Sequence, residues 1–311
     1  MYKVLNTDAA NLKKSEIHHA RLAIRLEACE AKVISYREGH PGGGLRKIYE
    51  LWRRLDEEHI RGISRDRFIG WMKSKGLVVN PFFTYPRTTK SGPRRVANQV
   101  SDTLVSYPHQ VWVSDTTYFK MNTNKHYYIT FVMDVYTRLI VGYAVSRSLH
   151  ATANVAALKM AIDRVGERVL RGQEIGLIFH TDGGAQYLEK AFKETLHGVN
   201  GRSSMGFIAQ DNAYAERVNG TIKHEYLLHW SQTRRSFAGL KQGVEQAVES
   251  YNGVRPHDNL PNKQRPEEFA QSWSDGQHRD YEEWIKPLSY GPPPRPKDEP
   301  LNSSNNHQET N

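Results

Sequence analysis

Hydrophobic and polar positions repeat with different periods along this chain, and the first clear repeat lies between residues 45 and 55. Apolar residues there recur at spacings of three and four, which predicts an amphipathic helix. A second helix is expected after Ser64, a suitable N-cap, with Phe68, Trp71 and Met72 turned inward. Basic residues cover the outside of both helices. The pattern indicates a helix-turn-helix or, equally, a helical hairpin with a solvated basic face.

A period of two replaces the helical period at residue 110. Three runs rich in β-branched and aromatic residues, separated by short polar turns, predict three antiparallel strands: VWVSDTTYF, HYYITFVMDVY and RLIVGYAVS. A helix with apolar residues from Val155 to Val169 follows, and the run IGLIF then indicates a buried strand. A sheet that begins antiparallel and gains strands through helical crossovers predicts an α/β layered domain. Further helices are expected around residues 187–198, 212–229 and 236–252.

The remaining segments complete the predicted organisation. Residues 15–35 favour a helix with a ragged apolar face, and the chain ends in a Pro-rich and then polar segment, for which we expect disorder from residue 291 onward. The predicted parts are an N-terminal helical segment without an assigned role (1–40), a helix-turn-helix-like DNA-binding domain (41–80), a basic linker (81–104), an α/β core domain (105–270) and a C-terminal extension (271–311).

Charge and cysteine content narrow the class of protein. The 311 residues carry 43 Lys and Arg against 34 Asp and Glu, a net charge of +9 with a pI near 9.4. This balance favours a polyanionic partner, nucleic acid or an anionic membrane surface. No apolar stretch reaches the ~20 residues that a membrane span needs, and the N-terminus lacks the apolar segment of a secretory signal. Cys29 is the only cysteine, which excludes internal disulfides and multi-cysteine zinc sites. We therefore expect a cytoplasmic protein.

Two aspartates occur at the predicted strands. Strand alternation places Asp115 on the same face as Val111 and Val113, where a lone buried carboxylate is costly. Asp182 follows the last predicted strand, at the kind of strand end where ligand sites collect in α/β sheets. Two glycines after Asp182 leave room for a bulky substrate to approach. Both aspartates are therefore candidates for a functional site.

Glu216 is the third acidic candidate. On the helix predicted for DNAYAERVNGTIKHE, Asn219 and Lys223 fall on the same side as Glu216, three and seven residues later. Two strand aspartates and one helix glutamate form an oxygen-rich site of the type that hard divalent cations prefer. Such a site suits phosphodiester displacement with two metal ions, and Lys223 beside it can hold a phosphate.

On spacing alone, each of these acidic residues also has a purely structural interpretation. The DGG turn chemistry accounts for Asp182 without any catalytic role. Asp115 can pair with a buried arginine, and Glu216 can be a solvated helix residue. Asp134 and Glu225 compete for the same catalytic roles on chemistry alone. A regular helix would place Glu225 opposite Glu216, as a solvated helix residue.

The residue identities in four segments are more specific than the spacing of the acidic residues. VWVSDTTYF, HTDGGAQY, DNAYAERVNGTIKHE and YNGVRPHDNL resemble the successive signature blocks of the DDE transposases of the insertion sequence three group (OrfB type), which share the catalytic core of retroviral integrases. The resemblance covers residues 105–270 strongly and residues 40–80 more weakly, the latter as a helix-turn-helix. It implies an α/β fold, an RNase H-like mixed sheet flanked by helices, preceded by a small helical domain.

The resemblance also implies roles for individual residues. Asp115, Asp182 and Glu216 become the catalytic, metal-binding triad, with two Mg²⁺ ions for which Mn²⁺ can substitute. Lys223, seven residues beyond the glutamate, becomes a contact to the DNA end, and we expect Asn219 beside it to contact DNA as well. Further DNA contacts are expected from charge alone at Arg65, Arg67, Lys73, Arg94 and Arg95.

The sequence departs from the resembled pattern in two places. The interval between Asp182 and Glu216 holds 33 residues where 35 is usual in the group, and LHGVNGRSSMGFIAQ is the expected place of the deletion. The first 40 residues match no part of the family, and the single cysteine excludes the zinc module that retroviral integrases carry there. Under the resemblance, Asp134 is a structural strand residue.

The expected function is metal-dependent cleavage of insertion-sequence ends followed by strand transfer. The alternatives are a transposase-derived DNA-binding or regulatory protein without strand transfer, and an RNase H-like nuclease that hydrolyses without joining. Expected partners are DNA, at element ends and target, and further copies of the chain, because two ends must be handled together. In the resembled group the active species is commonly a fusion with an upstream frame, so we expect the chain to be fused to such a product or to act with it. The expected place is the bacterial cytoplasm, associated with the nucleoid.

Overall fold

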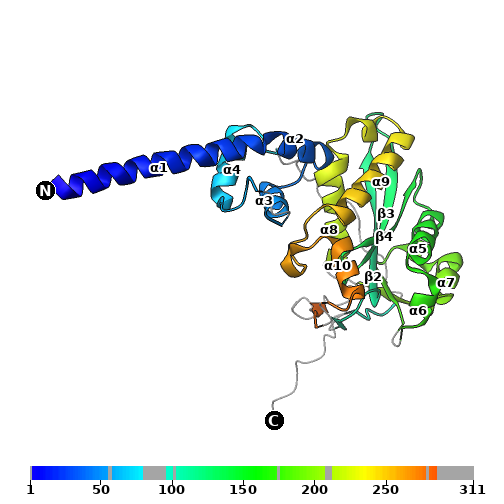
Figure 1. Ribbon diagram of the computed structural model, residues 1–311. Helices are drawn as coiled ribbons and strands as arrows, with labels where there is room; N and C mark the ends of the chain where they lie inside the picture. The colour runs from blue at the N-terminus through cyan, green and yellow to red at the C-terminus, as the bar shows by residue number, and fades with distance from the viewer. Residues whose placement is uncertain are drawn as a thin grey trace, which may run out of the picture.

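A five-stranded mixed sheet forms the centre of the molecule (Figure 1). The computed structural model describes residues 2–54, 58–79, 96–100, 103–173, 176–206, 212–277 and 280–285. The strand order is β4-β3-β2-β5-β6, in which β2 pairs antiparallel with β3 and β3 with β4, while β2 pairs parallel with β5 and β5 with β6. The strand bounds are β2 Val111–Lys120, β3 His126–Asp134, β4 Ile140–Ser146, β5 Ile178–Thr181 and β6 Arg202–Met205.

The first three strands form where the period of two predicted them. The β2–β3 connection closes through a Met121 N–H donated to the Lys125 carbonyl at 2.8 Å, with Asn124 at φ 60°. The fourth predicted strand is real but starts later than expected, at Ile178. Gly176 delays it because its φ of 74° lies outside the strand region. The α/β mixed sheet is therefore confirmed, and this strand start is shifted.

Helices cover both faces of the sheet (Figure 1). One face carries α5 Ala151–Val165, α6 Glu167–Arg171 and α7 Lys190–His197, and the other carries α8 Ala213–Ile222, α9 Phe237–Gly253 and α10 Pro266–Ser274. Alternation along β2 sends Trp112 into the core under α5, and Val111 and Val113 into the core under α8 and α9. The single helix expected through Val169 is divided into α5 and α6 at Gly166, whose φ is 92°.

A wide turn continues α8. Residues Lys223–Leu227 form a π-helical turn, whose hydrogen bonds span five residues instead of four. Tyr226 and Leu227 in this turn are fully buried and hold it against the core. The sequence predicted one uninterrupted helix here. The side chains after Lys223 therefore lie at angles that a regular helix would not give them.

The N-terminal region is a helical unit with its own core, and a long helix projects from it (Figure 1). Its helices are α1 Tyr2–Ala28, α2 Glu30–Gly39, α3 Leu45–Arg54 and α4 Arg65–Ser74. The Ser64 side chain caps α4 by accepting from the Arg67 N–H, as predicted. Residues from all four helices share one apolar cluster, which includes Leu22, Leu26, Val33, Ile48, Trp52, Phe68, Trp71 and Met72. The segments predicted as separate parts at residue 40 are thus joined by a common core.

This helical unit is attached to the sheet domain by polar contacts. The Gly42 N–H donates to the Glu225 carbonyl in the π-helical turn at 2.8 Å. Lys47 Nζ lies 2.8 Å from Asp258 Oδ2, and Lys263 Nζ lies 2.6 Å from Glu50 Oε1. Further contacts join Arg54 to Glu268 and to the Lys263 carbonyl. The continuation of the helix that carries Glu216 is therefore in direct contact with the N-terminal unit.

The sheet domain extends beyond the expected bounds of residues 105–270. A two-stranded sheet pairs β1 Thr103–Val105 with β7 Glu283–Ile285, and α10 ends at Ser274. Residues 97–100 of the predicted linker lie along β6, where the Met205 N–H donates to the Ala97 carbonyl at 3.3 Å. The rest of the predicted linker before residue 96, and the tail after residue 285, lie outside the described residues. No helix among the described residues is long and apolar enough to cross a membrane.

Candidate active site

Three acidic residues gather around the carboxyl end of β5. Asp115 lies in the middle of β2, Asp182 directly follows β5, and Glu216 lies in the first turn of α8. Ser114 pairs with Thr181 in the parallel ladder, so Asp115 and Asp182 are the next residues on adjacent strands. Adjacent strands lie about 4.8 Å apart, which brings these two residues close together. The structure thus brings together the three acidic residues that the sequence selected.

Electrostatic repulsion links the three carboxylates. Burial raises the pKa of Asp115 to about 7, and the negative charges of Asp182 and Glu216 contribute to this shift. The pKa of Asp182 is also raised, first by desolvation and then by the charge of Glu216, against a hydrogen bond from the Gly184 N–H. Ionising all three groups is therefore unfavourable unless a cation is nearby.

The donor set fits a hard divalent cation. All three side chains offer carboxylate oxygens, the ligands that Mg²⁺ and Mn²⁺ prefer, and their mutual repulsion favours a bound positive charge. In the part of the chain that the structure describes, no three acidic, His or Cys side chains lie close enough together to share one ion. Asp182 and Glu216 are exposed, so a hydrated cation can reach both carboxylates from solvent.

Asn219 in α8 and Lys223, the first residue of the π-helical turn, are close to Asp115. The Asn219 amide Nδ2 donates to Asp115 Oδ2 at 2.8 Å, and Asn219 is buried. Lys223 Nζ donates to Thr117 Oγ1 of β2 at 3.2 Å and lies 5.1 Å from the centre of the Tyr118 ring. Burial lowers the pKa of Lys223, while the charge of Asp115 acts in the opposite direction. Both residues therefore lie on the side of α8 that the sequence predicted.

Ser114 ties together the elements that carry the carboxylates. Its carbonyl accepts from Asn212 Nδ2, directly before α8, at 2.9 Å. Its hydroxyl lies 3.0 Å from the hydroxyl of Tyr187, in a short 3-10 helix after β5. Sequence reasoning missed Ser114, Asn212 and Tyr187 as supports of the site. Their place within the family-like segments, one to five residues from a candidate carboxylate, is the signal that could have found them.

The competing acidic residues have structural partners. Asp134 is fully buried and accepts from the N–H of His109 at 2.9 Å and from the N–H and Oγ1 of Thr137 at 3.0 and 2.6 Å. Its expected structural place is therefore observed. Glu225 accepts two hydrogen bonds of 2.7 Å from the guanidinium of Arg255, and only 19% of its side chain is exposed. The interpretation of Glu225 as a solvated helix residue was wrong, because the π-helical turn directs it toward Arg255.

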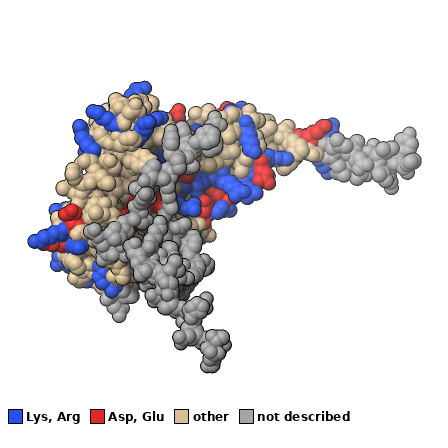
Figure 2. Space-filling model, turned by 180° about the vertical axis from the view of Figure 1, so that it is seen from behind, with Lys and Arg blue, Asp and Glu red and all other residues tan. Residues whose placement is uncertain are grey.

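Three of the residues expected to bind DNA by charge alone lie in the N-terminal unit, on α4. Arg65, Arg67 and Lys73 are exposed on α4, where Arg65 Nε lies 3.1 Å from Asp66 Oδ1. Figure 2 shows Lys and Arg side chains gathered, together with acidic ones, near the base of the projecting N-terminal helix. Arg94 and Arg95 lie outside the described residues. DNA contact by this group stays a prediction.

Comparisons with known proteins identify the family of the chain. Two family models described as integrase core domain match residues 106–206 and 202–264. The transposase for insertion sequence element IS629 of Shigella sonnei is 31% identical over 224 residues, which cover 71% of this chain and 71% of that protein. The putative transposase for IS986/IS6110 of Mycobacterium tuberculosis is 32% identical over 218 residues, 68% of this chain and 76% of the relative. The transposase InsF for insertion sequence IS3A of Escherichia coli is 30% identical over 126 residues, 40% of this chain and 41% of the relative.

A solved structure is similar at lower identity. The catalytic core domain of HTLV-2 integrase in complex with magnesium is 18% identical and has a TM-score of 0.39, with coverage of 52% of this chain and 97% of that one. The family assignment rests instead on the matched core segments, which contain Asp115, Asp182 and Glu216, and on the transposases that match two thirds of the chain or more. The chain therefore belongs to the DDE transposases of the insertion sequence three group, enzymes of the polynucleotidyl transferase type with an integrase catalytic core.

Proposed function

We propose that this protein cuts DNA at the ends of an insertion sequence and joins the freed 3′ hydroxyl to a second phosphodiester. Asp115, Asp182 and Glu216 are the catalytic residues of this proposal, and they hold two Mg²⁺ ions, for which Mn²⁺ can substitute. The observation that carries it is the grouping of three carboxylates from β2, the end of β5 and α8. Burial of Asp115 and, after it, the charges of Asp182 and Glu216 raise the pKa of Asp115 to about 7.

Two side chains beside the carboxylates have different roles in this proposal: one orients Asp115, and the other binds a phosphate of the DNA. Asn219 fixes one oxygen of Asp115 by donating to it at 2.8 Å. Lys223 lies over β2, two residues along from Asp115, where its ammonium can hold a phosphate of the DNA end. When bound, the metal ions would lower the pKa of the attacking hydroxyl and stabilise the leaving 3′ oxygen.

The partner that fits this chemistry is DNA, at both the element ends and the target. The net charge of +9 favours a polyanion, and the exposed basic residues of α4 offer a second contact surface away from the carboxylates. Because two ends must be cut and joined together, we propose that several copies of the chain assemble on DNA. A product of an upstream reading frame, fused to this chain or acting with it, would add end-specific binding.

A joining assay with matched glutamate variants tests the proposal. The substrate is labelled DNA carrying the inverted terminal repeats that flank the coding region, with Mg²⁺ or Mn²⁺. Glu216→Gln keeps the shape of the side chain and removes its charge, so cleavage and joining should be lost while DNA binding stays within about twofold. Glu245→Gln, at an exposed position of α9, is the matched control and should retain activity.

Three outcomes would contradict the proposal. Joining that survives Glu216→Gln would remove this residue from the catalytic set. Cleavage without joined products in the unaltered protein would indicate a nuclease. Binding of the ends without either reaction would indicate a regulatory protein that has lost the transposase chemistry.

A further inference from the structure

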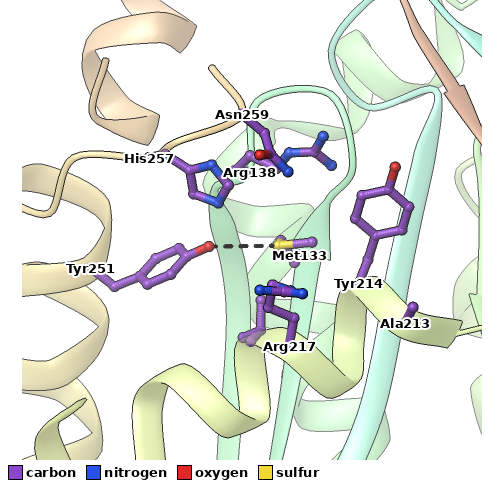
Figure 3. A pocket seen from close by; sticks show the side chains of 9 residues that line it. Met133, Arg138, Ala213, Tyr214, Arg217, Tyr251, His257 and Asn259 are labelled. Atoms are coloured by element: carbon purple, nitrogen blue, oxygen red, sulfur yellow. Dashed lines mark hydrogen bonds between the residues drawn. The ribbon is translucent and has the colours of Figure 1, made fainter. Parts of the chain in front are cut away.

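A cavity of about 200 Å³ lies between β3, α8 and α9 (Figure 3). Its floor consists of Met133 in β3, Arg138 in the turn after β3, and Tyr251 in α9, all of which are almost fully buried. Its rim includes Arg217 and Ala213 of α8, which are exposed. A buried floor with an exposed rim makes the cavity accessible to a ligand from solvent.

The cavity is adjacent to the proposed catalytic residues through two elements. Arg217 directly follows Glu216 on α8, so both backbones belong to the same helical turn. Met133 pairs with Val113 in the β2–β3 ladder, and Val113 precedes Asp115 on the same face of β2 by two residues, about 7 Å. A ligand that extends from the carboxylates along the sheet therefore reaches the cavity.

The charge of the cavity favours an anion. Arg138 and Arg217 supply two guanidinium groups, and none of the described residues that line the cavity is acidic. Burial and the nearby charges, with Arg138 first among them, hold the pKa of His257 at the cavity well below its usual value, so this side chain is neutral. Two fixed positive charges without a lining carboxylate attract a phosphate.

The walls of the cavity favour a ligand that carries an apolar group in addition to a phosphate. The Arg138 guanidinium lies 4.6 Å from the centre of the Tyr214 ring, and the Tyr251 hydroxyl donates to the Met133 sulfur at 4.0 Å (Figure 3). Tyr214 and Val218 add aromatic and aliphatic surface on α8. A ligand that has both a phosphate and a flat, partly apolar body uses all of these groups, and a nucleotide has this composition.

We propose that this cavity binds one unpaired nucleotide of the DNA strand that enters the carboxylate site, with its phosphate on Arg138 and Arg217 and its base against Tyr214. The proposal rests on the proposed function, because it takes DNA as the substrate. An enzyme that acts on DNA ends gains from such a site, since a nucleotide held outside the duplex fixes the position of the neighbouring phosphate.

The test measures binding of the full chain to two fluorescein-labelled duplexes of one sequence by fluorescence anisotropy. One duplex is blunt, and the other has three unpaired nucleotides at one end. The buffer contains EDTA, so that the result does not depend on catalysis. We expect the unpaired end to lower the Kd by at least about fivefold, the lower bound expected for one stacked base.

Two variants remove the preference in different ways. Arg217→Ala removes a rim charge, and Ala213→Phe fills the cavity from an exposed position at the start of α8. Both should reduce the preference for the unpaired end to less than about twofold. The Kd for the blunt duplex should rise by a smaller factor than the factor by which the ratio of the two Kd values falls. The matched control is Arg171→Ala on α6, whose arginine is exposed and pairs with Glu167, and the preference should persist in it.

Competition separates the possible ligands. Displacement of the unpaired end by inorganic phosphate as effectively as by dAMP would mean that the cavity binds an anion only, and the proposal would be wrong. Binding of free dAMP without any preference for the unpaired end would assign the cavity to free nucleotides and also overturn the proposal. Equal weakening of both duplexes by Arg217→Ala would make Arg217 a general backbone contact and would likewise contradict it. A failure of strand transfer would leave the measured preference unchanged, so the two proposals fail separately.

Discussion

Replacing Asp115 with Asn should stabilise the metal-free protein at neutral and alkaline pH. The change keeps the shape of the side chain and an oxygen that can accept from Asn219, and it removes the charge that Asp182 and Glu216 repel. In the folded protein, burial, Asp182 and Glu216 raise the pKa of Asp115 to about 7, whereas an unfolded chain gives about 3.9. Ionised Asp115 therefore lowers the free energy of unfolding.

The size and the pH range of the effect follow from this shift. About three pH units correspond to about 4 kcal/mol, and because Asp115 is only partly buried, water reduces this to roughly 2 kcal/mol. Below pH 4 both states are protonated and Asp115 causes no loss. Between pH 4 and 7 the unfolded chain releases its proton first, so the stability of the unaltered protein falls as the pH rises. The advantage of Asp115→Asn should grow over this range and stay constant above it.

Thermal unfolding in EDTA at pH 5 and pH 8 measures the effect. The Tm of Asp115→Asn should exceed that of the unaltered protein by about 4–8 °C at pH 8 and by less at pH 5. Asp163→Asn, at an exposed position of α5, is the control and should show no such change with pH. Addition of Mn²⁺ should raise the Tm of the unaltered protein more than that of Asp115→Asn. A difference in Tm that does not vary with pH would refute the electrostatic explanation.

Three other substitutions test contacts of the π-helical turn and of α9. Glu225→Gln should lower the free energy of unfolding by about 2–4 kcal/mol in urea, because it leaves the buried guanidinium of Arg255 without its charged partner. Its activity in the joining assay should stay within about tenfold of that of the unaltered protein. Gly42→Ala should weaken the attachment of the N-terminal unit by about 1–3 kcal/mol, because a Cβ there would overlap the backbone of the π-helical turn. Limited proteolysis should then detect faster cleavage between the two units. Asn252→Ala should cost about 2–4 kcal/mol in urea unfolding, since both atoms of this buried amide bond the backbone of Ile140 at 3.0 Å.

Matched controls separate these effects from general damage. Glu245→Gln removes an exposed glutamate and should change stability by less than about 0.5 kcal/mol. Gly44→Ala adds a methyl group where no atom lies within 4 Å, so the attachment of the N-terminal unit should persist. Equal effects of Gly42→Ala and Gly44→Ala on proteolysis would contradict the close contact of Gly42 with the π-helical turn. Unchanged stability of Glu225→Gln would show that water, not Arg255, satisfies this carboxylate.

Much of the sheet and of the site could be predicted because the signals are local. Alternation along β2 predicted that Asp115 shares a face with Val111 and Val113, the face that α8 covers. The spacing from Glu216 predicted that Asn219 and Lys223 lie on the same side of their helix, where they contact Asp115 and Thr117. Ser64 is a cap that depends only on residues within three positions of it. In each case the structural cause lies within a few residues of its sequence signal.

The features that could not be predicted depend on contacts between distant residues. Strands β1 and β7 have three residues each and lie more than 170 residues apart, so neither carries a period that indicates pairing. The helical wheel for Glu225 assumed a regular α-helix, whereas the π-helical turn Lys223–Leu227 changes the angle of each side chain after it. Packing of Tyr226 and Leu227 into the core fixes that turn, and the local sequence does not reveal such packing.

The contacts of Ser114 bear on how this site tolerates insertions and deletions. Its pairing with Thr181 and its hydrogen bond from Asn212 set the positions of Asp182 and Glu216 relative to Asp115. The 33-residue interval between Asp182 and Glu216 contains connections whose length does not enter these contacts. We therefore expect that the loss of two residues from that interval leaves both carboxylates in place. Relatives with unusual intervals are better recognised by the residues adjacent to each carboxylate than by the distances along the chain.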